Sequence, residues 1–280
     1  HMSCLIVTST HGNRGQDFYL TLTRKAMKKT ILAAAALAAL GAGVNVAYAA
    51  DAAEAAPEST LAFNLGVTSD YVFRGISQSR NRPAFSGGAD YTHNPSGMYV
   101  GTWVSTISWV NDSTPDGIKG NTPYELDIYG GQRGEISGGV SYDVGGIYYY
   151  YPSNKLTGFD ANTFEVYGQL GFGPAYLKVN YALTDTINTG SNGSYYIDLG
   201  TNLPLAEGIV LNLHAGHFSF KDNKAANYTD WKIGLTKDFG SGFSGAIAAT
   251  GTDADKGAWN LGGQGFLGDT KGIVTLTKTF

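Results

Sequence analysis

The sequence predicts an all-β fold, a transmembrane antiparallel up-and-down β-barrel of about 12 strands. Three observations lead to this prediction. Many segments alternate between apolar and polar side chains at every second residue, which is the pattern of a strand with two unlike faces. Alternately short and long connections join these segments, as in membrane barrels. The 280 residues also include 39 glycines and only 15% charged residues.

The N-terminal part predicts a segment that is removed from the mature protein. A basic start at Met27–Lys29 precedes an apolar run at 31–46, and Ala47–Ala49 forms an A-x-A cleavage site. We interpret 27–49 as a secretory signal peptide, with a retained anchor helix as the alternative, because the apolar run is short for a membrane-spanning helix. Residues 1–26 are then an upstream segment that starts with a cloning remnant, 50–60 a periplasmic lead-in, and 61–280 the barrel.

Cysteine content and charge exclude several classes of protein. The only cysteine, Cys4, precedes the predicted cleavage site, so the barrel has no disulfide, thiolate metal site or lipidated cysteine. Without positions 1–50, the 19 Lys and Arg fall to 14 and the 23 Asp and Glu to 22, a net charge of −8. Nucleic acid is therefore not an expected partner, since phosphate binding needs a basic surface.

The first predicted strand is Leu61–Gly75, and its alternation continues to Ser79. It exceeds an ordinary strand of about 5–6 residues and is long enough to cross a bilayer, which takes about 9–11 residues. Its odd positions, including Tyr71 and Phe73, are predicted to face lipid. Its even positions, including Asp70 and Arg74, are predicted to face the lumen.

Eleven further segments are predicted to follow as strands. The fourth directs Tyr124 and Leu126 outward and Glu125 and Asp127 inward, whereas the alternation of the third is blurred and the eleventh is short and rich in Gly and Ala. The last ends on the aromatic Phe280, through which we expect recognition by the barrel-assembly machinery. In order, the segments are Pro83–His93, Met98–Ile107, Pro123–Gly131, Ile136–Tyr150, Thr163–Phe172, Ala175–Thr184, Ser194–Leu203, Gly208–Phe218, Tyr228–Phe239, Gly242–Thr250 and Lys271–Phe280.

The connections between these segments fall into two groups. The short ones lie at 93–97, 131–135, 171–174, 204–208 and 240–242. The long ones lie at 76–82, 108–122, 151–162, 185–193, 219–227 and 251–270. A soluble sandwich has no reason to sort its loops in this way. An even strand number places both ends of the barrel on the short-turn, periplasmic side of a Gram-negative outer membrane.

Several stretches resemble the bacterial TorF-type porin family, and the likeness covers essentially the whole predicted mature chain. The most specific block is SDYVFRGISQS, and the resemblance implies an outer-membrane barrel with a channel role. It implies no particular solute. The matching stretches are Ser69–Ser79, Pro83–His93, Ser96–Thr106, Tyr124–Gly131, Val144–Pro152 and Thr275–Phe280.

Charged residues on the predicted inner faces are the candidate functional residues. Two alternatives stay open for them: the lining of a narrow pore with a mild cation preference, or a salt-bridged plug that fills the lumen. We expect Arg74 to pair with a carboxylate on a neighbouring strand, Asp90 being the nearest in sequence. The candidates are Asp70, Arg74, Asp90, Glu125, Asp127, Asp143, Glu165, Lys178, Asp198, Asp230 and Lys232.

The function expected from these features is passive diffusion of small hydrophilic solutes or ions. The expected partners are outer-membrane lipid, these solutes and the assembly machinery. We predict no catalytic, cofactor or metal site, because no spacing selects a nucleophile for His93, His214 or His217. A non-conducting structural or surface-interaction barrel and an outer-membrane hydrolase are the alternatives.

Overall fold

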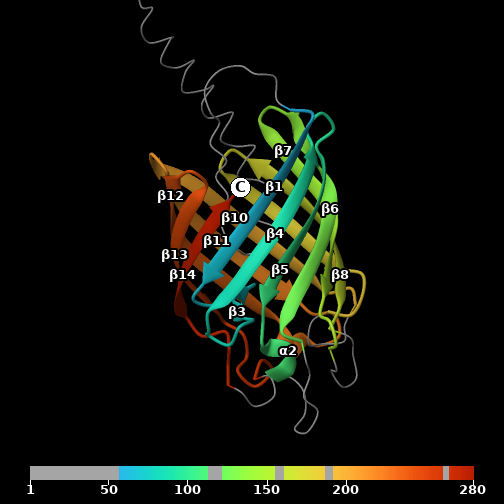
Figure 1. Cartoon of the computed structure of the whole chain (residues 1–280). Coiled ribbons are helices and arrows are strands. Elements are labelled where there is room, and N and C mark those ends of the chain that lie inside the picture. The colour runs from blue at the N-terminus through green and yellow to red at the C-terminus, as the bar shows by residue number, and fades with distance from the viewer. Residues whose placement is uncertain (1–56, 113–121, 155–160, 187–191, 261–264) are drawn as a thin grey trace, which may run out of the picture.

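The computed structural model describes residues 57–112, 122–154, 161–186, 192–260 and 265–280, which form a closed antiparallel barrel (Figure 1). The predicted twelve-stranded all-β barrel is confirmed. The predicted upstream segment, the signal peptide and most of the lead-in lie outside the described residues. The barrel strands are β1 (Ser59–Thr68), β4 (Ala84–His93), β5 (Met98–Thr106), β6 (Tyr124–Ser137), β7 (Val140–Tyr150), β8 (Thr163–Phe172), β9 (Ala175–Ala182), β10 (Tyr195–Ala206), β11 (Ile209–Ser219), β12 (Tyr228–Gly240), β13 (Phe243–Thr252) and β14 (Lys271–Thr279).

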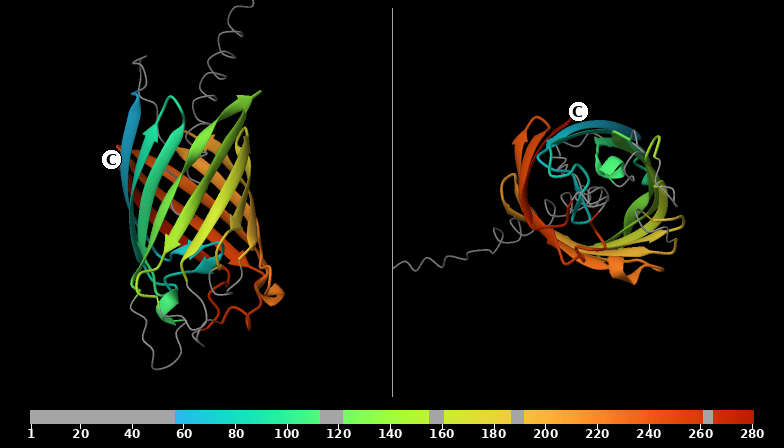
Figure 2. Two further views of the ribbon diagram at one scale, coloured as in Figure 1. Left: turned by 90° about the vertical axis from the view of Figure 1, so that its right-hand side faces the viewer. Right: turned by 90° about the horizontal axis from the view of Figure 1, so that it is seen from below.

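The barrel closes where its first strand meets its last. β1 pairs with β14 from Asn64↔Thr279 to Thr68↔Thr275, and with β4 along its whole length. Closure gives every strand two neighbours, so no strand is left as an open edge of the sheet. The short turns gather at one end and the long loops at the other, here called the short-turn end and the long-loop end (Figure 2).

The outer surface of the barrel is apolar, and its inner side is polar. Along β8, for example, the outward Val166, Leu170 and Phe172 are exposed, whereas the inward Glu165 and Gln169 are buried. Monomers in water rarely expose apolar patches of more than a few hundred Å², and a continuous apolar band is what lipid requires. Within the described residues, no helix is long and apolar enough to span a bilayer.

One predicted turn is misplaced. The glycine-rich stretch at 131–135 belongs to β6, and the chain turns instead at Gly138–Gly139, with φ of 63° and 82°. Glycine suits a two-residue hairpin turn because it accepts positive φ. Gly131 has another role, since a Cβ there would lie 2.8 Å from the Tyr99 hydroxyl. It makes room for a tyrosine inside the barrel.

The first predicted strand is also wrong beyond Thr68. The chain leaves the wall at Ser69 and folds into the barrel as loop 1 (69–83), which carries the short strands β2 (Val72–Phe73) and β3 (Ile76–Ser77). Viewed from the long-loop end, this teal segment lies inside the ring of strands (Figure 2). The prediction that Tyr71 and Phe73 face lipid is wrong, because Tyr71 is 3% exposed and the Phe73 ring packs inside the barrel against Tyr149, at 5.5 Å between ring centroids. The alternation persisted to Ser79 because the inner hairpin, Val72–Ser77, is itself a β structure.

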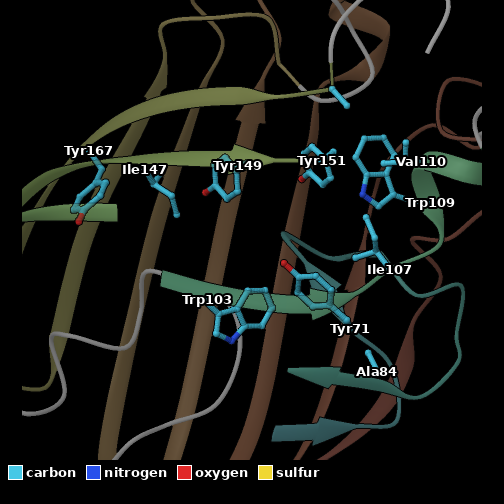
Figure 3. Close-up of a cluster of buried hydrophobic side chains, with 11 residues drawn as sticks. Tyr71, Ala84, Trp103, Ile107, Trp109, Val110, Ile147, Tyr149, Tyr151 and Tyr167 are labelled. Atoms are coloured by element: carbon cyan, nitrogen blue, oxygen red, sulfur yellow. The ribbon is translucent and has the colours of Figure 1, made fainter. Parts of the chain in front are cut away.

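Two buried aromatic clusters pack around loop 1 toward the long-loop end. In the first, Tyr71 contacts Trp103 edge to face at 5.2 Å between ring centroids, and Trp109 of α2 (Trp109–Asp112) contacts Tyr151 in the same way (Figure 3). The second contains Ile76 of the hairpin; its other members are Tyr196, Phe218, Phe220, Ala226, Tyr228, Ala254, Trp259 and Leu267. Ala226 belongs to the short helix η1 (Lys224–Ala226). Loop 1 therefore has a packed core of its own inside the barrel.

Candidate functional site

The predicted inner residues lie inside the barrel, but they reach it in two ways. Nine of them project from barrel strands. The other two, Asp70 and Arg74, belong to loop 1 instead of the predicted first strand. The strand residues are Asp90 on β4, Glu125 and Asp127 on β6, Glu165 on β8, Lys178 on β9, Asp198 on β10 and Lys232 on β12. Asp143 on β7 and Asp230 on β12 complete the nine and are buried inside.

The inner hairpin has a tight two-residue turn formed by Arg74 and Gly75. Their φ values are 45° and 79°, so both lie in the left-handed region that a two-residue hairpin of this kind requires. Glycine accepts this conformation readily, whereas arginine does not. A Cβ on Gly75 would lie 2.6 Å from Asp230 Cβ. The hairpin tip thus touches β12, three strands away around the barrel from β1, where loop 1 starts.

On the far side of the barrel from β1, Arg74 is held to β8 by an ion pair with Glu165, here called the Arg74 clasp. Its Nη1 and Nη2 donate to Glu165 Oε1 and Oε2 at 2.9 Å and 2.6 Å, and the two side chains are 6% and 3% exposed. Asn180 Nδ2 also donates to Glu165 Oε2 at 3.0 Å. A bidentate contact matches the planar guanidinium fork to the carboxylate. The expected pairing of Arg74 with Asp90 is wrong, because Asp90 accepts from Tyr129 Oη at 2.6 Å.

Aromatic rings complete the site around the guanidinium. The Cζ atom of Arg74 lies 4.4 Å from the ring centroid of Tyr196 and 4.7 Å from those of Phe218 and Phe73. Each distance is within cation–π range. Burial by itself lowers the pKa of Arg74, but Glu165 outweighs it and raises the pKa above its ordinary value. The guanidinium therefore stays charged inside the barrel.

Asp70 holds the base of loop 1 in place. Its Oδ1 accepts hydrogen bonds from Ser77 Oγ at 2.5 Å and Ser79 Oγ at 2.9 Å. Its Oδ2 lies 3.4 Å from Lys271 Nζ at the start of β14. Asp70 therefore joins the two arms of loop 1 to each other and to the barrel wall, a structural role.

Glu125 and Asp127 differ in their surroundings although they are neighbours on one face of β6. Tyr71 Oη donates to Glu125 Oε1 at 2.7 Å, which ties the carboxylate to loop 1. Asp127 is 1% exposed, and its Oδ1 has no hydrogen-bond partner among the residues that the structure describes. In register it lies between Trp103 on β5 and Tyr149 on β7. This acidic pair faces the same lumen as the Arg74 clasp.

His214, to which the sequence analysis assigned no role, bridges carboxylates on two strands, β10 and β12. His214 Nδ1 lies 2.7 Å from Asp198 Oδ1, and its Nε2 lies 2.7 Å from Asp230 Oδ2. Tyr196 Oη donates to Asp230 Oδ1 at 2.8 Å. Lys232 stands opposite His214 in the β11–β12 register. Both imidazole nitrogens are engaged by carboxylates, so neither is free to activate a nucleophile.

The half of the lumen nearer the short-turn end carries tyrosines paired with charged groups. Tyr99 Oη donates to Asp143 Oδ1 at 2.6 Å and also contacts Tyr167 Oη. The Lys178 ammonium lies 4.0 Å from the Tyr167 ring centroid. Arg133, missed because its stretch was interpreted as a turn, donates to Thr92 and lies over the Tyr99 ring. Tyrosine hydroxyls, not opposite charges alone, satisfy the inner carboxylates.

Comparisons with known proteins give general likenesses in shape and one family. No curated protein matches the sequence. Among solved structures, the KdgM porin aligns with a TM-score of 0.48 at 6% identity, over 79% of this chain and 99% of its own. The NanC porin aligns with a TM-score of 0.48 at 10% identity, over 79% of this chain and 99% of its own. An outer-membrane channel from Pseudomonas putida F1 aligns with a TM-score of 0.46 at 11% identity, over 81% of this chain and 97% of its own. Residues 52–280 match the family model Gcw_chp, and the chain therefore belongs to this family of bacterial proteins of unknown function.

Proposed function

We propose that this protein is an outer-membrane, porin-like channel for small hydrophilic solutes or ions, and that loop 1 controls its opening. One observation carries the proposal. The inner hairpin crosses a charged lumen, and the Arg74–Glu165 ion pair holds its tip to the opposite wall. Conduction then depends on whether the hairpin tip is docked, and no covalent chemistry is involved.

The wall of the barrel supports the location. Large apolar side chains are exposed along the outward faces of its strands, such as Leu65 on β1, Ile233 on β12 and Leu276 on β14. Only lipid can solvate such a belt without a large cost. The predicted signal peptide supports export to an outer membrane. β14, followed by the exposed Phe280, supplies the terminal strand that we propose the assembly machinery recognises.

The lumen supports passage of polar species on its short-turn side. Asp90, Tyr99, Tyr129 and Arg133 point inward there but are only half-buried, so water reaches them. Twelve strands enclose more space than the eight that side chains alone can fill. Loop 1 occupies part of that space on the long-loop side. The charged wall and the inner hairpin together suit a channel with a constriction.

Single-channel recording of the refolded protein in planar lipid bilayers tests the proposal. Discrete current steps in simple salt are expected, and their frequency or size should increase when the Arg74 clasp is removed. If both the wild type and a variant without the Arg74–Glu165 ion pair form folded barrels but give no current steps, the channel function is overturned.

A non-conducting barrel is the second candidate, favoured by the two aromatic clusters. Trp109 and Phe220 are each at most 1% exposed, and they pack against loop 1 as core residues would. Such packing stabilises a fixed hairpin. The same recordings separate the two candidates, because a fixed hairpin gives no steps in either protein.

A further inference from the structure

The wall site that holds Arg74 has the chemistry of a binding site for a free guanidinium. One carboxylate, Glu165, is buried and presents both oxygens to the plane of the cation. Two rings of the wall, Tyr196 and Phe218, lie against the guanidinium. Among the described groups that contact it, Phe73 alone belongs to loop 1. The site therefore remains in the barrel wall if the hairpin leaves.

We propose that this wall site recognises guanidinium-bearing cationic solutes, and that Arg74 occupies it as an internal ligand. The inference rests on the proposed function for the solute that would reach the site, and it names the chemical class of that solute. A planar, weakly hydrated guanidinium suits a bidentate carboxylate flanked by aromatic faces better than a compact, strongly hydrated ammonium does.

The sequence of the hairpin turn supports a ligand role for Arg74. The first position of such a turn favours Asn, Asp or Gly, because φ is positive there. Arginine at φ 45° departs from that preference. A conformation that turn chemistry disfavours persists only where surrounding contacts hold it. The contacts that hold it here are those of the wall site.

Competition between Arg74 and a solute is feasible on general grounds. A group on a short flexible linker has an effective concentration on the order of millimolar, and the packed hairpin that carries Arg74 gives it a higher one. A solute with the same cationic group competes for Glu165 when its concentration in the lumen exceeds this effective concentration. Displacement releases the hairpin tip from the wall, so the solute that binds is also the solute that opens the lumen.

Chemical rescue of Arg74→Gly tests the inference without requiring conduction. Glycine keeps the positive φ of the turn and removes the guanidinium, which leaves Glu165 buried and unpaired. The probe is methylguanidinium, added to the full-length refolded variant in detergent. We expect a saturable rise in the unfolding midpoint, followed by circular dichroism, that methylammonium at equal ionic strength does not reproduce.

Three matched proteins define the outcome. The wild type should show no rise, because its site is occupied, and Arg74→Gly combined with Glu165→Gln should show none, because the carboxylate is gone. Arg133→Gly removes another inner arginine, one whose side-chain hydrogen bond is to Thr92, and should not be rescued. Equal rescue by methylammonium, or rescue that survives Glu165→Gln, would overturn the assignment to guanidinium. If Arg74→Gly refolds poorly, the refolding yield becomes the readout. A yield that methylguanidinium does not raise would also overturn the assignment to guanidinium.

Channel recordings separate this inference from the proposed function. Conduction by the wild type without any rescue of Arg74→Gly would reject the guanidinium site and leave the channel intact. Rescue without conduction by any variant would reject the channel, and with it the solute role of the site. The two proposals therefore fail on different measurements.

Discussion

Replacing Glu165 with glutamine is expected to release the inner hairpin from the barrel wall. The amide keeps the size of the side chain but cannot neutralise the Arg74 guanidinium, whose side chain is only 6% exposed. Breaking a buried ion pair by removing one partner costs about 3–5 kcal/mol. A loss of about 3 kcal/mol shifts an equilibrium by roughly 150-fold. The docked hairpin should therefore become the minor state, unless its population in the wild type exceeds that of the undocked hairpin by more than this factor.

Single-channel recording in planar bilayers measures the effect. Glu165→Gln should give more frequent or larger current steps than the wild type. Glu135→Gln is the matched control, because Glu135 is exposed beside the short turn after β6 and should leave the current unchanged. A Glu165→Gln current equal to that of the conducting wild type would refute the idea that this ion pair holds the constriction.

Three further measurements test other parts of the structure. Replacing Glu125 and Asp127 together by their amides should lower the cation-over-anion selectivity in reversal-potential measurements, and an unchanged potential would place them off the conducting path. Tyr71→Phe leaves the buried Glu125 carboxylate without its 2.7 Å hydrogen bond, and should lower the unfolding free energy in urea by about 1–3 kcal/mol. Ile233→Arg, in the middle of a lipid-facing strand, should cost about 2–4 kcal/mol in vesicles, whereas Leu205→Arg beside a short turn should cost about 0–1 kcal/mol; equal costs would contradict the membrane placement.

The strand faces could be predicted from the sequence because they are a local property. Glu125 and Asp127 alternate with Tyr124 and Leu126, and the structure places the first pair inside and leaves the second pair on the outer face. Alternation fixes which way a side chain points but not where the strand stops. The same rule therefore failed beyond Thr68, where a hairpin inside the barrel continues the period of the wall.

The partner of Arg74 could not be found in this way. Glu165 lies 91 positions away and faces Arg74 across the lumen, not along a shared pair of strands. Sequence proximity favoured Asp90, because consecutive strands of an up-and-down barrel are neighbours and Asp90 lies on the next predicted strand. Only the path of loop 1 through the lumen brings the two charges together, and that path is set by packing at its base and tip.

The inner tyrosines did leave a signal that could have been used. Gly101 stands opposite Tyr129 in the β5–β6 register, and a Cβ on Gly101 would lie 2.5 Å from the Tyr129 ring. An inward glycine on one strand thus provides the space for an inward tyrosine on the next. Glycines at inward positions, which resembled turn signals, instead mark where large rings fold down into the lumen.

The turn at Arg74 bears on the hairpin movement that we propose. Holding a residue in a sparsely populated backbone region costs of order 1–3 kcal/mol. That cost offsets part of the stabilisation from Glu165, Tyr196 and Phe218, so the docked state is favoured by less than its contacts alone suggest. Arg74→Asn would relieve the backbone strain but lose the clasp. Arginine at this position therefore fits a hairpin that is held firmly but can be displaced by a competing cation.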